Sequence, residues 1–257
     1  GEQSQWAYLS SDGEVLIVAS RDMDTSGERG VTLWGKGEPA PLSQDDQGPV
    51  NPGSGPSSGP SRTTSGDDIF DLPAQNEAVD GGLGIDTITY NMNSESFNLS
   101  VVNGTLTITE SFNGWTHTLT NVERVQFSDK TLAFDSDGHA GEAAKVIGAF
   151  LGATAIQNTE TVRTVLGLLD GGLSFDDLLQ QALNSVFGEN PLSTDIVNHF
   201  HNALTGVPAN DDILGTYSGL LDTGSLSSLE FARQVAEFEL NIQNIDLIGI
   251  AASGLEY

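Results

Sequence analysis

Cysteine is absent from the 257 residues of the chain. Its absence excludes a disulfide framework, a cysteine-rich zinc site and a thiol nucleophile. Long apolar runs are also absent, since no stretch of 18 apolar residues occurs. The sequence therefore predicts no membrane-spanning helix and no insertion into a membrane.

Basic residues are scarce as well. Nine lysines and arginines stand against 36 aspartates and glutamates, which gives a formal net charge of −27. Such a chain repels nucleic acids and anionic lipids, so neither is an expected partner. It also repels itself unless its carboxylates are neutralised, and divalent cations or high salt would do that.

Residues 1–43 are predicted to form a short β segment. The stretch WAYLSSDGEVLIVAS offers a strand, a turn at Asp12-Gly13 and a second strand over Val15–Ala19. GVTLWG, at residues 30–35, offers a third strand. The aromatic residues of this segment are favoured as the core of a small sheet over an exposed docking patch.

Residues 44–62 are dense in glycine, proline and serine and cannot build a core, so they are interpreted as a linker. The letters GPSSG inside this segment match the nucleophile elbow G-x-S-x-G. That motif needs a strand before it and a helix after it, and the segment offers neither. A serine nucleophile is therefore not expected here.

A period of nine residues begins at residue 63. Three successive segments align with one another: TTSGDDIFD (63–71), LPAQNEAVD (72–80) and GGLGIDTIT (81–89). An acidic residue recurs at Asp68, Glu77 and Asp86, and an apolar residue follows each of them two places later. This is the nonapeptide pattern G-G-x-G-x-D-x-U-x of parallel β-rolls, which the third segment matches fully.

The pattern predicts a calcium site. Each nonapeptide is a tight turn and a short strand, and two make one coil, so Asp68 and Asp86 stack on the same side. Glycine permits the turn geometry that points carbonyl oxygens inward, and calcium prefers carbonyl and carboxylate oxygens. One calcium ion is predicted between the two turns, with these metal-site residues: Asp68, Asp86, Gly66, Gly82 and Gly84. An ordinary glycine-rich hairpin loop is the alternative. Glu77 falls on the opposite side, where no matching turn follows.

Residues 90–135 are predicted to continue as antiparallel β-structure. Asn103-Gly104 lies between two alternating runs, which is a strong hairpin signal. The stretch GWTHTLTNVERVQFSDKTLAFD adds two more predicted strands. DSDGHAGEA, at 135–143, marks the change to helices, and capping by Asp137 is favoured over the start of a calcium loop.

Residues 136–257 are predicted to be helical and internally repeated. VLGLLDGGLSFDDLLQQALNSVF (165–187) aligns with YSGLLDTGSLSSLEFARQVAEF (217–238) after one insertion. Each copy carries Leu-Leu-Asp, a glycine turn and a serine capping box that starts the next helix, at Ser174 and Ser227. The helix after the first box places these apolar residues on one face, as core packing requires: Leu178, Leu179, Ala182, Leu183 and Val186.

These motifs together resemble RTX-type calcium-binding proteins. LTNVERVQFSDKTLAFD (119–135) is similar to the β module that follows RTX repeats in proteobacterial secreted proteins. The helical order after it resembles a domain at the C-termini of type I-secreted proteins, related to phycobilisome-linker repeats. The resemblance covers about residues 63–257. One departure is the absence of the tryptophan that family members often carry before the Leu-Leu-Asp turn.

The expected fold is α+β and multi-domain. It comprises four parts: a β segment at 1–43, a linker at 44–62, a small RTX-like parallel β-roll with an antiparallel β cap at 63–135, and an α-helical repeat domain with a C-terminal secretion signal at 136–257.

The resemblance implies a calcium-binding extracellular or cell-surface structural protein. It would leave a Gram-negative cell through the type I secretion apparatus, using an uncleaved C-terminal signal. The first residues, GEQSQWAYLSSDGEV, show no signal peptide. Its partners would be copies of itself, in a surface layer, filament or matrix, or cell-surface components. The alternative is a secreted adhesin or effector whose residues 1–43 recognise a carbohydrate or a protein. No enzymatic activity is expected, because the sequence carries no H-E-x-x-H, phosphate loop or Ser-His-Asp set.

Overall fold

The computed structural model describes residues 5–9, 15–20, 32–35, 65–71, 75–102 and 104–257. The chain divides into two compact units, Gly1–Gly59 and Pro60–Tyr257. No helix in the described ranges is long and apolar enough to cross a membrane.

The first unit contains a three-stranded antiparallel sheet. Its strands are β1 (Gln5–Leu9), β2 (Val15–Ser20) and β3 (Thr32–Gly35), in the order β1-β2-β3. All three strands predicted for residues 1–43 are therefore confirmed. The predicted turn at Asp12-Gly13 and the predicted linker at 44–62 lie outside the described residues.

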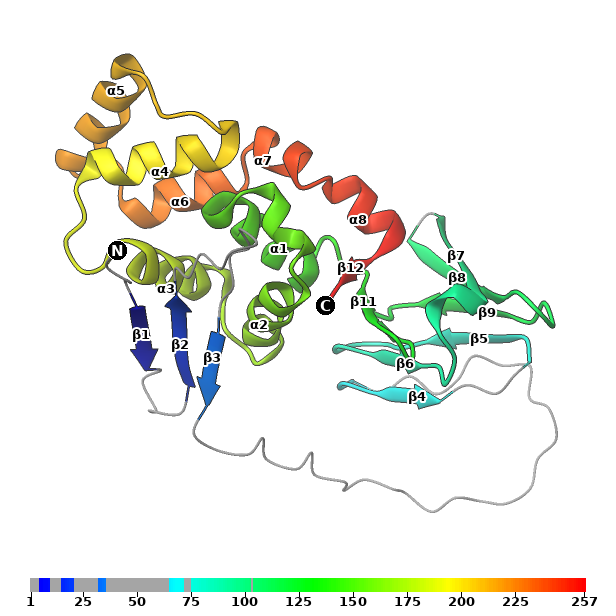
Figure 1. Ribbon diagram of the computed structural model, residues 1–257. Coiled ribbons are helices and arrows are strands. Elements are labelled where there is room, and N and C mark those ends of the chain that lie inside the picture. The colour runs from blue at the N-terminus through cyan, green and yellow to red at the C-terminus, as the bar shows by residue number, and fades with distance from the viewer. Residues whose placement is uncertain (1–4, 10–14, 21–31, 36–64, 72–74, 103) are drawn as a thin grey trace, which may run out of the picture. The chain divides into compact units, whose positions relative to one another are not determined.

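The second unit begins with two mixed β-sheets (Figure 1). One has five strands in the order β12-β11-β10-β6-β4, and the other has four in the order β5-β9-β8-β7. The strands are β4 (Ile69–Asp71), β5 (Glu77–Asp80), β6 (Thr87–Thr89), β7 (Phe97–Val102), β8 (Thr105–Glu110), β9 (Thr116–Thr120), β10 (Arg124–Gln126), β11 (Thr131–Ala133) and β12 (Leu255–Glu256). A short 3-10 turn, η1 (Ser94–Ser96), precedes β7.

Strands from the three nonapeptides alternate between the two sheets. β4 and β6 are parallel neighbours in the five-stranded sheet, with Ile69 opposite Thr87, while β5 belongs to the four-stranded sheet. The offset of 18 residues is the one that the nonapeptide period predicts. The predicted parallel β-roll is not found in the described residues, because β6 pairs on its other side with β10 and β5 pairs with β9. The strands are instead built into the same sheets as the strands that follow.

The predicted hairpin at Asn103-Gly104 is confirmed. β7 and β8 pair in antiparallel register around it, and Gly104 has a φ of +77°. The next stretch forms three strands, β9 to β11, where the sequence predicted two. The reason is Asn121, whose φ of +51° turns the chain between β9 in one sheet and β10 in the other.

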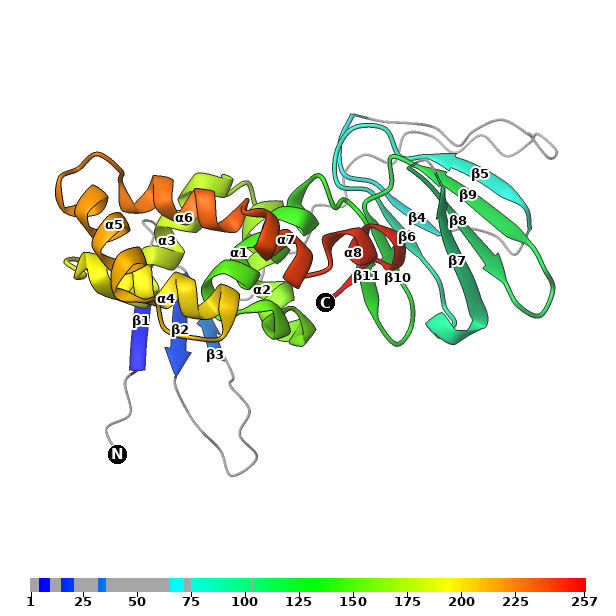
Figure 2. The ribbon, with the colours of Figure 1, turned by 90° about the horizontal axis from the view of Figure 1, so that it is seen from above.

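The second half of the unit consists of eight α-helices, which confirms the predicted α+β class (Figure 2). They are α1 (His139–Leu151), α2 (Thr159–Asp170), α3 (Phe175–Phe187), α4 (Ser193–Thr205), α5 (Asp211–Asp222), α6 (Ser228–Ala236), α7 (Glu239–Asn244) and α8 (Leu247–Ser253). A 3-10 turn, η2 (Ala153–Gln157), joins α1 to α2. The chain then returns to the sheet, where β12 pairs with β11 in antiparallel register.

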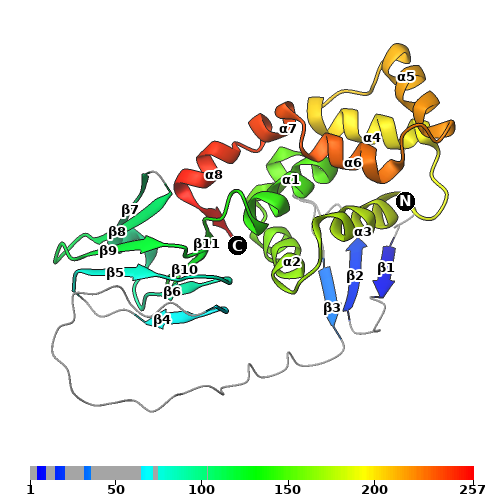
Figure 3. The ribbon, with the colours of Figure 1, turned by 180° about the vertical axis from the view of Figure 1, so that it is seen from behind.

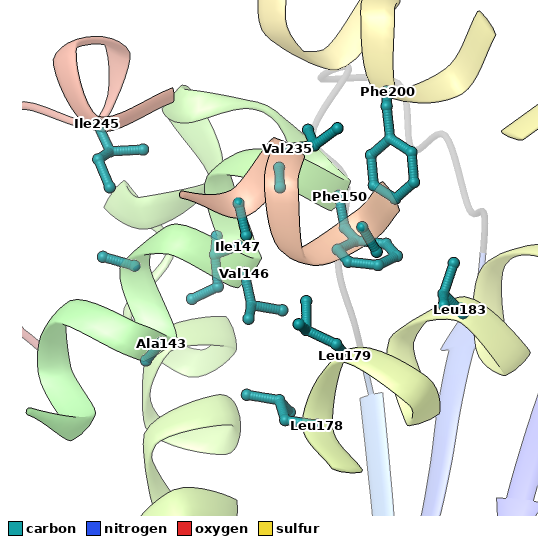
Figure 4. Packing of buried hydrophobic residues seen from close by; sticks show 14 of the residues in the cluster. Ala143, Val146, Ile147, Phe150, Leu178, Leu179, Leu183, Phe200, Val235 and Ile245 are labelled. Carbon is teal, nitrogen blue, oxygen red and sulfur yellow. The ribbon is translucent and has the colours of Figure 1, made fainter. Parts of the chain in front are cut away.

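Helix α1 is the centre of the helical core. It is rich in alanine and glycine, and most of its residues are buried, which is expected of a helix surrounded by others. Figure 4 shows Ile147 and Phe150 of α1 among apolar side chains from α3, α4 and α6. Gly148 lets Ile245, the residue after α7, pack closely against α1, because a Cβ at position 148 would lie 2.4 Å from a methyl carbon of Ile245.

The predicted serine caps are confirmed, and the proposed cap of α1 is wrong. Ser174 and Ser227 each accept a hydrogen bond from the backbone N–H three residues later. At α1 the N-cap is Gly138, and Asp135 rather than Asp137 accepts a bond from the Ala140 N–H, at 3.3 Å. The physical reason is that Asp135 is held in place by an ion pair with a buried arginine.

That arginine, Arg124, joins the sheets to the helices. It is the first residue of β10, and its side chain is 2% exposed. One guanidinium nitrogen binds Asp135, which precedes α1, and another binds Asp170, the last residue of α2, at 2.8 Å. His139, the first residue of α1, shares the same Asp170 oxygen at 2.9 Å. The start of α1 and the end of α2 are thus fixed to one residue of the five-stranded sheet.

We expect Arg124→Met to lower the free energy of unfolding by about 3 kcal/mol, because it leaves two partly buried carboxylates without their buried cation. Urea denaturation followed by far-UV circular dichroism measures this loss. The matched control is Arg163→Met, which removes an exposed pair with Glu160 on α2 and is expected to cost less than about 1 kcal/mol. Equal losses in the two variants would contradict the role of Arg124.

Candidate metal centre

Two turns that are 18 residues apart in the sequence lie against each other. Each immediately precedes a strand: the Asp68 turn precedes β4, and the Asp86 turn precedes β6. The Asp68 N–H donates to Asp86 Oδ1 at 2.9 Å, and the Ile85 N–H donates to Asp67 Oδ1 at 2.7 Å. The Thr87 N–H then donates to the Asp68 carbonyl at 2.8 Å, where the parallel pairing begins. The structure therefore brings together Asp68 and Asp86.

Glycine lets the two turns approach this closely. Gly84 has a φ of +121°, and a Cβ there would lie 2.6 Å from the carbonyl carbon of Gly66 and 2.8 Å from the Asp67 nitrogen. Gly82 has a φ of +103°, which side chains rarely adopt. A Cβ at Gly66 itself would meet nothing within 4 Å. Gly82 and Gly84 are thus required by the backbone, whereas Gly66 provides the surface that Gly84 contacts.

Asp86 is a buried carboxylate with one unsatisfied oxygen. Its side chain is fully buried, and Oδ2 has no hydrogen-bond partner. Oδ2 points at the backbone of Gly81, where a Cβ would lie 2.6 Å from Oδ2 and 1.9 Å from the carbonyl oxygen of Asn121. A second oxygen therefore converges on the same place, and any side chain at position 81 would clash with both.

The surroundings of Asp86 disfavour its negative charge. Burial raises the pKa of Asp86 above the usual range, and the nearby carboxylates of Asp68, Asp67 and Asp80 raise it further. The hydrogen bond from the Asp68 N–H acts in the opposite direction without reversing the shift. A cation at Oδ2 would relieve this cost, as would a proton.

Glu123 extends the acidic surroundings towards β10. Its Oε2 accepts the Asp86 N–H at 2.9 Å. Burial raises the pKa of Glu123, and the charges of Asp86 and Asp135 add to that effect. The Asp86 carbonyl in turn accepts from the Arg124 N–H at 2.9 Å. The centre is thus connected through the backbone to the arginine that holds the helices.

The carboxylates alone do not form a metal cage. Within the described ranges, no group of three or more histidine, aspartate or glutamate side chains is arranged to hold a metal ion. Glu77 lies on β5 in the four-stranded sheet, in register with His117 of β9. An ion beside Asp86 would need backbone carbonyl oxygens as further ligands, which calcium accepts readily.

Sequence reasoning did not identify Gly81, Asn121 or Glu123 as parts of this centre. Gly81 is the first glycine of the matching nonapeptide, so the pattern itself contained that signal. Asn121 and Glu123 belong to the later β module, and no local pattern places them beside Asp86. Comparison of the chain with known protein families and with curated proteins finds no match.

The raised pKa values have a consequence for stability that Asp86→Asn tests. Carboxyl groups with raised pKa values bind protons more tightly in the folded chain than in the unfolded chain. Their contribution to stability is therefore present at low pH and is lost as pH rises from about 4 through the folded pKa. We expect Asp86→Asn to raise the free energy of unfolding at pH 7 without calcium, and to reduce this pH dependence.

Urea denaturation of both chains between pH 4 and pH 8, in chelator, gives the measurement. Glu110 and Asp129 have pKa values shifted downward, so the difference between the two chains, rather than either curve, isolates Asp86. The control is Asp71→Asn, which makes the same charge change at an exposed position of β4. A loss of stability in Asp86→Asn at pH 7 would show that the charge of Asp86 is not a cost.

Proposed function

We propose that the chain is a calcium-binding extracellular structural protein that assembles with copies of itself into a surface layer, filament or matrix. In this proposal the two adjoining turns at Asp68 and Asp86 hold calcium. The protein leaves the cell by type I secretion and meets calcium outside. The observation that carries the proposal is the buried, unpartnered Oδ2 of Asp86.

Calcium fits the chemistry around Asp86. The oxygen is a hard ligand, and the neighbouring acidic side chains raise the local negative charge. Asp86 and Asp68 would bind the ion through their side chains. The turns of Gly66, Gly82 and Gly84 would contribute carbonyl oxygens. The bound ion would neutralise charge that the folded chain otherwise carries at a cost.

The overall charge supports an extracellular role for calcium. With 36 acidic residues against nine basic ones, the chain repels itself in the cytosol, where calcium is scarce. Outside the cell, calcium binding favours the folded state by mass action. Folding that waits for calcium would keep the chain extended until export and would favour movement in one direction.

Self-assembly is supported by the small sheet of the first unit. It has three strands, and β1 and β3 are its edges. A unit of this size is marginally stable alone, and edge strands offer unpaired backbone groups to a neighbour. The same edges would serve an adhesin that binds a carbohydrate or another protein, which is the second candidate function.

Calcium titration of full-length variants tests the site. We expect Asp86→Ala to weaken calcium binding about tenfold or more, because it removes a charged ligand, and Glu77→Ala to weaken it much less. Isothermal titration calorimetry gives the affinities. Far-UV circular dichroism of the unsubstituted chain should gain β-signal with millimolar calcium and lose it with chelator. Equal losses in the two variants would place the ion elsewhere in the repeat, and an unchanged spectrum would exclude calcium-coupled folding.

Truncation tests the assembly. Removing residues 1–43 should leave a folded, calcium-binding monomer, because the second unit has its own cores. Analytical ultracentrifugation and electron microscopy in calcium compare it with the full chain, and circular dichroism checks its fold. Polymers of unchanged form after truncation would rule out this role for the segment. A full chain that stays monomeric at high concentration in calcium would favour the adhesin instead.

A further inference from the structure

The helical domain contains two copies of a three-helix repeat, α1–α3 and α4–α6. The ends of corresponding helices are capped in the same way. Asn158 and Asn210 accept a hydrogen bond from the N–H three residues later, at the starts of α2 and α5. Ser174 and Ser227 do the same for α3 and α6. The repeat therefore extends beyond the aligned sequence to whole helices.

In both copies of the repeat, a hydrogen bond also joins the first helix to the second. In the first copy, α1–α3, His139 begins α1 and bonds to Asp170, the last residue of α2, at 2.9 Å. In the second copy, α4–α6, Ser193 begins α4 and donates to Asp222, the last residue of α5, at 2.5 Å. Asp222 is therefore the structural counterpart of Asp170.

The two aspartates differ in what else they bind. Asp170 also receives the guanidinium of Arg124 from the five-stranded sheet, at 2.8 Å. Asp222 is exposed, and no ion pair to it occurs in the part of the chain that the structure describes. In the first copy, Arg124 of the five-stranded sheet thus binds at this end of the helix pair. In the second copy, no described residue of 65–257 takes the corresponding place.

The apolar residues next to Asp222 are open as well. Helix α2 buries four residues, whereas α5 buries one. Val165 and Leu168 of α2 are half-buried, but their counterparts Tyr217 and Leu220 are each 39% exposed. Leu192, just before α4, is 66% exposed. Figures 1 and 3 place α5 at the end of the helical domain away from the two sheets of the second unit.

We propose that this open end is a docking surface for an arginine carried by residues 1–43 of a second copy. The docking surface consists of Leu192, Ser193, Tyr217, Leu220 and Asp222. In this contact a guanidinium binds Asp222 as Arg124 binds Asp170, and the segment covers the exposed leucines and tyrosine. The inference rests on the proposed self-assembly and identifies the surface that receives the N-terminal segment.

The choice of an arginine follows from the counterpart site. A guanidinium is planar and weakly hydrated, so it suits a carboxylate that becomes partly buried better than a lysine does. At the counterpart, Asp170, the residue that binds is Arg124, an arginine on a β-strand. The flanking apolar side chains would then exclude water from the pair.

The choice of segment follows from the positions of the arginines. Three of the six lie in residues 65–257, and each already faces a carboxylate of its own chain: Arg124, Arg163 and Arg233. Of the other three, Arg62 falls in the segment 44–62, whereas Arg21 and Arg29 belong to residues 1–43 and fall in the sequence between β2 and β3. A segment at one end of the chain that docks on a helix pair near the other makes a head-to-tail contact, which generates an open polymer when its rotation does not close a ring.

Neutralising Asp222 tests the surface in the full-length chain. Asp222→Asn retains an oxygen that accepts from Ser193, so the fold should persist, and thermal unfolding checks this. We expect the concentration needed for assembly in calcium to rise about tenfold. The control is Glu237→Gln, which removes the same charge from an exposed residue after α6 and should leave assembly unchanged. Assembly of Asp222→Asn at the unsubstituted concentration would overturn the inference, while the calcium-dependent assembly itself would still stand.

Charge reversal and cross-linking identify the occupant. Asp222→Arg should abolish assembly, and adding Arg21→Asp or Arg29→Asp in the same chain should restore it. Because the chain has no cysteine, Leu220→Cys in one copy can be linked by a bismaleimide to Ser20→Cys or Gly30→Cys in another. Dimers that form only in the mixture support docking between copies, even where no polymer forms. Failure of both rescues, no dimer in the mixture, or linkage only within one doubly substituted chain would overturn the proposal.

Discussion

The ion pairs of Arg124 are the constraint on which the arrangement of sheets and helices depends. A guanidinium that is 2% exposed is tolerable only if its carboxylate partners stay in place. Those partners are Asp135, before α1, and Asp170, at the end of α2. Holding them fixes two helices of the core to one strand. Helix α1 then organises the other helices, since most of its residues are buried among them.

The candidate metal centre lies directly beside this junction. The Arg124 N–H binds the Asp86 carbonyl, and the side chain of the preceding residue, Glu123, binds the Asp86 N–H. The unsatisfied carboxylate immediately precedes β6, and the helix-holding arginine begins β10, which pairs with β6 in parallel register. Neutralising Asp86 changes the electrostatic surroundings of Glu123 first. The charge at the turns and the attachment of the helices thus share one short piece of backbone.

Local patterns predicted what local physics determines. The hairpin at Asn103-Gly104, the capping serines and the 18-residue register between Asp68 and Asp86 each depend on a few neighbouring residues or on a strict period. The misassigned cap of α1 and the other residues of the centre depend on contacts across long separations. Arg124 and Asp170 are 46 residues apart, and Asp86 and Glu123 are 37 apart. No local preference distinguishes Asp135 from Asp137, because the arginine that selects Asp135 comes from another strand.

The repeated helical unit shows how a shared framework acquires different surfaces. Both copies retain the terminal aspartate of the second helix and its bond to the first helix. In the first copy, the aspartate neutralises a buried cation that the five-stranded sheet supplies. In a chain with a net charge of −27, a second aspartate at the same place adds repulsion unless a cation meets it. The apolar residues exposed beside Asp222 point the same way, because an isolated helix end gains nothing from leaving them in water. Charge and exposure together favour a covered Asp222 in the assembly that we propose.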